Sequence, residues 1–227
     1  MKPAPLDTPP SDMLAFERRV YHRGFQRVCG IDEAGRGPLA GPVVAAAVIL
    51  PRDADLTDVK DSKLLSPMQR EACYEAIVGC ALDVGIGRID AQEIDRINIL
   101  QATFRAMIQA VQNLRSLPDY LLIDGPYELA LPIVQEGIPG GDVKSLSIAA
   151  ASIVAKVRRD RLMVEYHDLY PHYGFDQHKG YPTRAHCEAL GRYGSCPIHR
   201  QSFRGVAGSG RGRAYDGGNA ANQRKGR

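Results

Sequence analysis

The sequence predicts an α/β fold in which helices cover both faces of a mixed sheet. Two short apolar runs, at residues 43–50 and 120–124, are continuous rather than alternating, which is typical of strands buried on both faces. From residue 94 to residue 114, apolar side chains recur three and four positions apart, as they do on the buried face of a helix. Because predicted strands and helices alternate only partly along the chain, we expect both parallel and antiparallel strand pairs.

The other elements follow from local signals, taken in chain order. Residues 27–32 form a short apolar run that ends in an acid and predicts the first strand. Ser66, followed by Pro and by Gln at the third helical position, has the pattern of a capped helix start. Apolar residues alternate with Gly at 84–88 and predict a strand, and Asp90 is placed to cap the long helix that follows. Residues 145–166 predict a helix that begins with small residues, which let a helix approach a sheet closely.

The chain is long enough for one domain with a buried core. It has 227 residues, of which 44% are hydrophobic and 24% charged, as in soluble globular proteins. We expect a flexible Pro-rich N-terminus over residues 1–12, a single folded domain over 13–205 and a disordered, Gly-rich tail over 206–227. The formal charge of +3 belongs to this basic tail, because the rest of the chain is close to neutral.

Several classes of protein are excluded by composition. The longest apolar stretch, residues 38–50, is shorter than the roughly 20 residues that cross a bilayer. The N-terminus has no apolar segment typical of a secretory signal. The five cysteines include no CxxC pair, which argues against a disulfide framework. We therefore expect a reduced, cytoplasmic protein with no membrane partner, and we take it to be a monomer.

Acidic residues at the ends of predicted strands are the first candidates for chemistry. Asp32 and Asp124 each end a buried strand, Glu33 follows Asp32, and Asp142 precedes the Ala- and Ser-rich helix. An ionised carboxylate beside an apolar core is unfavourable unless it is paired or bound to a metal, although a single such acid more often caps a helix or meets an arginine. Carboxylate oxygens suit Mg²⁺ or Mn²⁺, and four acids at sheet ends are typical of two-metal phosphoryl transfer.

The adjacency of Asp32 and Glu33 imposes a geometric condition on such a site. Neighbouring strand residues point to opposite faces, so both carboxylates can reach one site only if the strand ends or bulges there. The turn at residues 34–38 supplies a break. Gly35 and Gly37 within it permit unusual dihedral angles and close approach of a ligand to backbone N–H groups.

A series of collinear motifs runs from about residue 28 to residue 204. They are GIDEAGRGPLAGPV at 30–43, DSKLLS at 61–66, INILQAT at 97–103, IDG at 123–125, AAASIVAKV at 149–157, RDR at 159–161, HKGYPT at 178–183 and HRQSF at 199–203. Together these motifs closely resemble the bacterial ribonuclease HII family. The resemblance does not cover the two termini.

The resemblance implies a ribonuclease H-like fold, with a mixed five-stranded sheet flanked by helices and a helical C-terminal extension. It implies a metal-dependent endoribonuclease that hydrolyses the RNA strand of RNA–DNA hybrids. It also implies cleavage 5′ to single ribonucleotides in duplex DNA, giving 3′-hydroxyl and 5′-phosphate ends and starting ribonucleotide removal. The partners would be hybrids and ribonucleotide-containing DNA, and the cofactor Mg²⁺ or Mn²⁺, with two ions during catalysis.

The family's catalytic and metal-binding acids correspond to Asp32, Glu33, Asp124 and Asp142, although the Gly-Gly-Asp flank of Asp142 differs from the more usual Lys-Gly-Asp. Its substrate-binding residues correspond to Gly35, Arg36, Gly37 and Tyr181. We also expect Lys63 to lie near a nucleic-acid phosphate and to bind substrate. Distinguishing RNA from DNA requires contact with one 2′-hydroxyl. Backbone groups beside the glycines can hydrogen-bond it, and the Tyr181 ring can stack on a sugar or base. Taken alone, Tyr181 would more often be a half-buried aromatic and Lys63 a solvated loop residue.

Two other functions remain open from the residues alone. Another metal-dependent nuclease of the same fold would use similar acids, but it would not explain the Gly-Arg-Gly turn or Tyr181. A non-enzymatic nucleic-acid binder would explain the basic tail, but four acids without metal repel phosphate. A cluster of His and Cys residues between 172 and 199 lacks the regular paired spacing of a zinc site, so we do not predict zinc there.

Overall fold

The computed structural model describes residues 12–56, 59 and 65–206 of the chain. In chain order the elements, with η for a 3-10 helix, are α1 (Ala15–His22), β1 (Val28–Ala34), β2 (Val43–Ile49), α2 (Pro67–Cys80), β3 (Asp83–Ile89), α3 (Ala91–Ile97), α4 (Ile99–Gln112), β4 (Tyr120–Asp124), β5 (Val134–Ile138), η1 (Gly141–Val143), α5 (Leu146–Leu169), η2 (Pro171–Tyr173), α6 (Phe175–His178) and α7 (Arg184–Tyr193). Residues 1–11, 207–227 and Lys63 lie outside the described residues, and so do nearly all of the predicted flexible N-terminus and tail.

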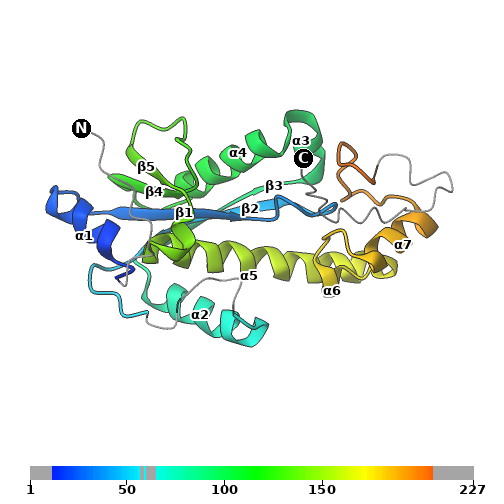
Figure 1. The fold of residues 1–227 in the computed structure, drawn as a ribbon, viewed down its shortest axis with the longest axis horizontal. Coiled ribbons are helices and arrows are strands. Elements are labelled where there is room, and N and C mark those ends of the chain that lie inside the picture. Colours follow the sequence, from blue (N-terminus) through cyan, green and yellow to red (C-terminus); the bar gives the residue numbers. More distant parts are fainter. Residues whose placement is uncertain (1–11, 57–58, 60–64, 207–227) are drawn as a thin grey trace, which may run out of the picture.

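The strands form one mixed sheet in the order β3-β2-β1-β4-β5. β2 pairs antiparallel with both β1 and β3, whereas β4 pairs parallel with both β1 and β5. Helix α4 covers one face and α5 the other, with α2 outside α5, and α6 and α7 lie beyond one end of the sheet (Figure 1). This arrangement confirms the predicted mixed sheet with helices on both faces and a helical C-terminal part.

The alternation of side chains along β2 explains its continuous apolar sequence. Ala45, Ala47 and Ile49 pack into the core between the sheet and α4. Ala46 and Val48 pack into the opposite core, which α2 and α5 close. Because both faces of this strand are covered, neither face can be polar.

Glycines on the strands allow the helices to lie very close to the sheet. A Cβ atom on Gly30 would lie 2.1 Å from the backbone carbon of Ser147 in α5. On the other face, Cβ atoms on Gly85 and Gly87 would lie 2.0 and 1.9 Å from carbonyl oxygens of α4. The alternating glycines of β3 therefore form a surface on which the backbone of α4 rests.

Local signals placed several helix starts correctly. The side chain of Ser66 accepts from the backbone N–H of Gln69, and the Gln69 side chain reaches back to the backbone of Ser66, so α2 begins with a capping box. Asp90 caps α3, and Ser145 caps α5, which runs on to Leu169, three residues beyond the expected end.

Two expectations about the elements were wrong, and one strand was not predicted. The first strand does not end at Asp32 but continues to Ala34, because it still pairs there with β2. The fifth strand, β5, carries no clear signal in the sequence. The long helix expected at 94–114 is two helices, α3 and α4, because Asn98 adopts φ 68° and its side chain caps α4 by accepting from the N–H groups of Leu100 and Gln101.

Asn98 provides a direct test of this break. Asn98→Ala should lower the free energy of unfolding by about 1–3 kcal/mol, since it removes the helix cap and keeps a Cβ at positive φ without the hydrogen bonds that offset this strain in Asn. Asn98→Gly should cost less than about 1 kcal/mol, because glycine tolerates this conformation. Urea unfolding followed by circular dichroism measures both, and equal losses would contradict the conformational argument.

Helix α1 is attached to the start of α5 through a buried acid. Glu17 is 1% exposed, and its Oε1 accepts hydrogen bonds from the Ser145 hydroxyl at 2.6 Å and the Ser147 N–H at 2.9 Å. Its other oxygen, Oε2, has no hydrogen-bond partner among the described residues. Burial raises the pKa of Glu17, while the hydrogen bonds from Ser145 and Ser147 oppose this increase.

A raised pKa in the folded state means that folded protein binds the proton of Glu17 more tightly than unfolded protein. The wild-type protein should therefore lose stability as the pH rises above the ordinary pKa of a glutamate. Glu17→Gln lacks this proton, so its stability relative to wild type should improve from pH 4 to pH 7. Urea unfolding at both pH values tests this, with the exposed Glu165→Gln as the control. A difference that does not change with pH would contradict the expected direction.

Candidate active site

Acidic residues from separate elements meet at the ends of β1 and β4. One carboxylate oxygen from each of Asp32, Glu33 and Asp124 lies within 4.8 Å of the others. Asp142, in η1, lines the same cleft of about 260 Å³, although it does not belong to this close group of three. Asp32 and Asp142 are 5% and 6% exposed, so the cleft presents its acids from a largely buried floor.

The pairing of β1 shows how adjacent acids reach one site. On one side β1 pairs with β2 as far as Ala34, but on the other its pairing with β4 stops at Ile31 and Ile123. Beyond that point no strand formed by the described residues pairs with β1 on the β4 side. The carboxylates of Asp32 and Glu33 come together here although both residues pair in regular register with β2, so the strand neither bulges nor ends at the acids.

Burial and the closeness of the acids raise the pKa values of Asp32 and Glu33. Burial raises the pKa of Asp32 well above its ordinary value, and the carboxylates of Glu33 and Asp124 raise it further. Burial also raises the pKa of Glu33, although the Arg36 guanidinium, 3.2 Å away, opposes the increase. A divalent cation would relieve both the repulsion and the loss of hydration. The donor set of carboxylate oxygens fits a hard cation such as Mg²⁺ or Mn²⁺.

Asp124 also organises the element that carries Asp142. Its Oδ1 accepts a hydrogen bond of 2.7 Å from the N–H of Gly141, and Gly141 begins η1. The strand end and the 3-10 helix are thereby tied together. This hydrogen bond holds Asp142 in a fixed position relative to Asp124, although the bonded residues are 17 positions apart in sequence.

The Gly-Arg-Gly turn follows the acids directly and forms another wall of the cleft. Gly35 has φ +97°, and a Cβ there would lie 2.0 Å from Nε of Arg159, so only glycine fits. Gly37 adjoins Tyr181, since a Cβ on it would lie 3.7 Å from the tyrosine ring. The turn and Tyr181, which the sequence predicts to act together, are therefore neighbours.

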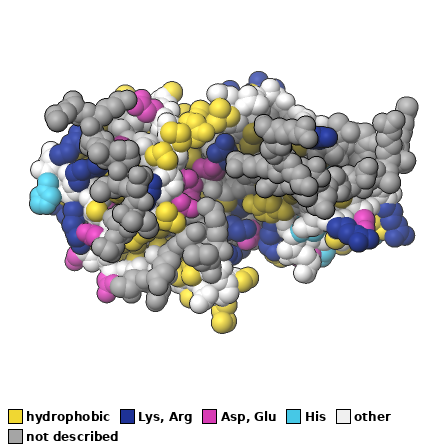
Figure 2. Space-filling view, in the orientation of Figure 1, with side chains coloured by type: hydrophobic (Ala, Val, Ile, Leu, Met, Phe, Trp, Pro, Cys, Tyr) yellow, Lys and Arg dark blue, Asp and Glu magenta, His cyan; other side chains and the backbone are white. Residues whose placement is uncertain are grey.

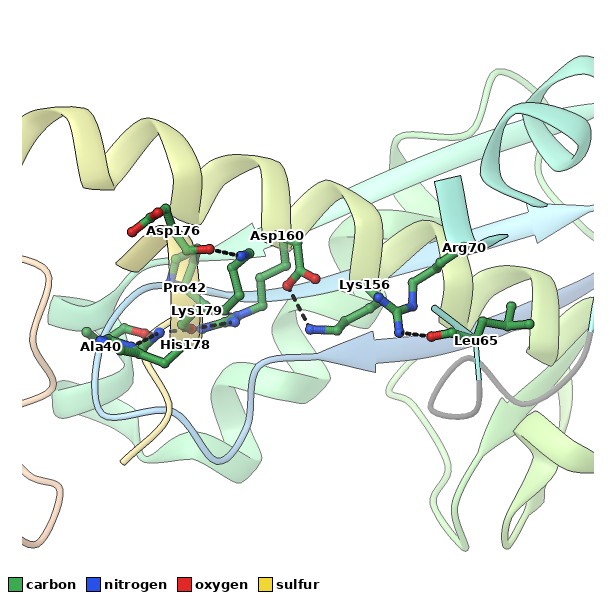
Figure 3. A network of polar contacts seen from close by, with 11 residues as sticks. Ala40, Pro42, Leu65, Arg70, Lys156, Asp160, Asp176, His178 and Lys179 are labelled. Carbon is green, nitrogen blue, oxygen red and sulfur yellow. Dashed lines mark hydrogen bonds and ion pairs between the residues drawn. The ribbon is translucent and has the colours of Figure 1, made fainter. Parts of the chain in front are cut away.

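Two fully buried arginines hold this turn from behind. Both Arg159 and Arg200 are 0% exposed. Arg159 donates to the carbonyl oxygens of Ala40, Pro42 and Lys179 at 2.9–3.1 Å, and these three acceptors are labelled in Figure 3. Burial lowers the pKa of Arg159 to about 10. At neutral pH the group remains a cation and binds carbonyl dipoles of the segment after the Gly-Arg-Gly turn and of the segment before Tyr181.

Arg200 fixes the direction of the peptide groups in the turn. It donates to the carbonyl oxygens of Gly35 at 2.6 Å, Arg36 at 2.9 Å and Gly41 at 2.9–3.0 Å. In a trans peptide the carbonyl and the following N–H point in opposite directions. The N–H groups of Arg36 and Gly37 therefore point away from Arg200. Burial, with Arg159 nearby, lowers the pKa of Arg200 to about 9.

Some residues of the cleft were not singled out from the sequence. Arg70, Ser152 and Lys156 also line it, and Ser152 hydrogen-bonds the Asp32 carboxylate. Lys156 pairs with Asp160 at 2.7 Å, and Arg70 donates to a backbone carbonyl at 2.8 Å (Figure 3). The four-residue spacing of Ser152 and Lys156 on a predicted helix was the available signal, since it places both on one helix face.

The outer surface carries charges of both signs. In the space-filling view, acidic side chains gather near the middle of the visible face, with basic side chains beside them (Figure 2).

None of the helices formed by the described residues combines the length and apolar character that crossing a bilayer requires.

The five-stranded mixed sheet, with carboxylates clustered at the ends of two adjacent strands, defines a nuclease of the ribonuclease H-like class. Comparison with known proteins agrees: the family model described as Ribonuclease HII matches residues 29–206. The chain belongs to the ribonuclease HII family and is an enzyme of the ribonuclease H type.

Individual relatives support this assignment along most of the chain. The chain is 65% identical to the ribonuclease HII of Syntrophobacter fumaroxidans, over 90% of this chain and 88% of the relative. It is 58% identical to the ribonuclease HII of Geobacter sulfurreducens, over 84% and 88%. Among solved structures, the ribonuclease H2 of Pyrococcus horikoshii OT3 superposes with a TM-score of 0.68 at 28% identity, covering 80% of this chain and 95% of that one.

Proposed function

We propose that the protein hydrolyses the RNA strand of RNA–DNA hybrids and also cuts duplex DNA on the 5′ side of a single embedded ribonucleotide. The products would carry 3′-hydroxyl and 5′-phosphate ends, and the reaction would start removal of the ribonucleotide. The observation that carries this proposal is the shared cleft: the acids, the Gly-Arg-Gly turn and Tyr181 line one cavity. The groups proposed to sense ribose therefore adjoin the acids proposed to carry out hydrolysis.

The acids would act as metal ligands and the surrounding residues would prepare them for that role. Asp32, Glu33, Asp124 and Asp142 would hold two Mg²⁺ or Mn²⁺ ions, which when bound supply an activated water and stabilise the leaving oxygen. Arg36 keeps the Glu33 carboxylate oriented by their ion pair at 3.2 Å.

Selection of ribose would rest on the turn and on Tyr181. The N–H groups of Arg36 and Gly37 point away from Arg200 and are available as fixed donors to a 2′-hydroxyl. Tyr181 is 41% exposed, so part of its ring is accessible to stack on a neighbouring sugar or base. The Nζ of Lys156, 6.0 Å from the centre of this ring, is placed to meet a phosphate. Lys63, whose predicted role is also phosphate contact, lies outside the described residues.

The direct test uses DNA duplexes that differ in one hydroxyl group. A duplex with a single ribonucleotide should be cut at its 5′ side with Mg²⁺ or Mn²⁺, and should stay intact in EDTA. The matching all-DNA duplex should stay intact under all conditions. Denaturing gels locate the cut, and ligation of the product confirms the 5′-phosphate.

The same experiment separates the alternatives. Cutting of the all-DNA duplex at a similar rate would indicate a different nuclease of this fold. Binding without cleavage in any metal would indicate a non-enzymatic nucleic-acid binder. Either result would overturn the proposed function.

A further inference from the structure

Two buried histidines connect the C-terminal segment to the backbone of Tyr181. His186 in α7 is 0% exposed and His199 is 2% exposed. Nδ1 of His186 lies 2.9 Å from the carbonyl oxygen of Tyr181, and its Nε2 lies 3.0 Å from Nε2 of His199. Nδ1 of His199 lies 2.9 Å from the backbone N of Cys196. The rings form a continuous hydrogen-bonded chain from Cys196 to Tyr181.

The ends of this chain determine where its protons lie. A carbonyl oxygen only accepts, so Nδ1 of His186 carries a proton and donates it to Tyr181. A backbone N–H only donates, so Nδ1 of His199 is unprotonated and accepts from Cys196. His199 then carries its proton on Nε2 and donates it to the bare Nε2 of His186. Two neutral rings satisfy these three contacts, and the three bonds run in one direction.

An added proton does not fit this chain. A charged His186 would direct an N–H at the N–H of His199. A charged His199 would direct one at the N–H of Cys196, where the Cys196 Sγ, 3.1 Å from Nδ1, is only a weak acceptor. Burial lowers the pKa of both rings to about 4. His178 stacks on His186 with ring centroids 4.5 Å apart, and burial lowers its pKa as well. The chain therefore stays neutral with a single set of tautomers.

The segment before Tyr181 is anchored in the same way. His178 is bonded to the carbonyl oxygen of Tyr173 at 2.7 Å through Nε2 and accepts from the Gly180 N–H at 3.2 Å through Nδ1. The carbonyl oxygen of Gly180 accepts from the Leu39 N–H at 2.8 Å. This bond ties the segment before Tyr181 to the chain that follows the Gly-Arg-Gly turn. The Tyr181 carbonyl oxygen also accepts from the Thr183 N–H at 2.8 Å, so His186 adds a side-chain donor to a carbonyl that the local turn already binds. The Tyr181 ring itself is 41% exposed, so backbone contacts of this kind help to set where it lies.

We propose that His186 and His199 are positioning residues for ribonucleotide recognition, which hold the Tyr181 ring against the Gly-Arg-Gly turn by fixing the Tyr181 carbonyl. The inference rests on the proposed function of Tyr181. Neither histidine touches substrate; they restrict how far the ring can move from its stacking position. A small displacement of a group that positions the substrate can lower the rate of cleavage strongly.

Two substitutions of His186 separate positioning from general stability. In Asn the amide nitrogen takes the place of Nδ1, so His186→Asn keeps the donor to Tyr181 and loses the bond to His199. In Gln the amide takes the place of Nε2, so His186→Gln keeps the bond to His199 and loses the donor to Tyr181. The melting temperatures of the two variants should fall by similar amounts. On the single-ribonucleotide duplex, kcat/KM should fall about tenfold for His186→Gln and less than about threefold for His186→Asn.

A second pair and a mutant cycle keep the test decisive if one variant folds poorly. His199→Gln keeps a donor toward His186 and should retain more activity than His199→Asn. In a Tyr181→Ala background, His186→Gln should have almost no further effect on kcat/KM, because the ring that it positions is gone.

The outcomes distinguish this inference from the proposed function. If wild type fails to cut the single-ribonucleotide duplex, the proposed function is wrong. If wild type cuts it but the Asn and Gln variants of His186 are equally active, the positioning role is wrong. Additive effects of His186→Gln and Tyr181→Ala would also overturn it.

Discussion

Asp124→Asn should lower the rate of cleavage by about a thousandfold or more, because several kcal/mol of charge stabilisation by a bound metal ion correspond to roughly that factor. The substitution changes charge and leaves shape almost unaltered. The remaining amide oxygen of residue 124 can still accept from the N–H of Gly141, the contact that holds η1. A loss of activity would therefore report on metal ligation and not on collapse of the site.

Binding should respond in the opposite direction. Removal of a negative charge from the group of three acids lowers the repulsion of the substrate phosphate, so affinity without metal should stay equal or rise. Single-turnover gels measure cleavage, and fluorescence anisotropy of a labelled duplex in EDTA measures binding. Asp53→Asn is the control, because Asp53 is exposed and distant in sequence from every predicted ligand. Full activity in Asp124→Asn would refute the assignment of the acid as a ligand.

The sequence predicts the elements well where local signals and packing agree. Both cores use alternate residues of β2, so its apolar run is unambiguous. The break at Asn98 is hidden because apolar residues on both sides of it face the same core, and the periodicity continues across the two helices. β5 has the half-exposed sequence Val-Gln-Glu-Gly-Ile at the sheet edge. It becomes a strand by pairing with β4, a contact that no local pattern reveals.

The sequence likewise predicts some of the site's residues and not others. Acids that end or nearly end buried strands stand out, since a carboxylate beside an apolar core needs a reason to be there. Buried cations give no such signal, because arginines are usually exposed. Arg200 and its acceptor Gly35 are 165 positions apart, and only the folded chain brings them together. The resemblance to the ribonuclease HII family marked the motif around Arg200 without indicating its role.

Arg200→Met should lower the free energy of unfolding by about 3–5 kcal/mol, which is the expected scale when a buried, fully bonded charged group loses its contacts. The methionine has a similar length and fills part of the space, but it leaves the carbonyl oxygens of Gly35, Arg36 and Gly41 without their donors. Urea unfolding followed by far-ultraviolet circular dichroism measures the loss, since the chain contains no Trp for fluorescence. Arg192→Met, on the exposed surface of α7, should change stability by less than about 1 kcal/mol.

Arg200→Lys separates the charge of the side chain from its shape. Lysine keeps the positive charge but replaces the planar fork with a single ammonium group, which cannot reach all three carbonyls with the same geometry. We expect Arg200→Lys to recover less than half of the stability lost in Arg200→Met. The peptide groups at Arg36 and Gly37 would then no longer be fixed, so kcat/KM on the single-ribonucleotide duplex should fall at temperatures where the variant is fully folded. Wild-type stability and activity in Arg200→Lys would show that charge alone suffices, and that the fork does not set the direction of the turn.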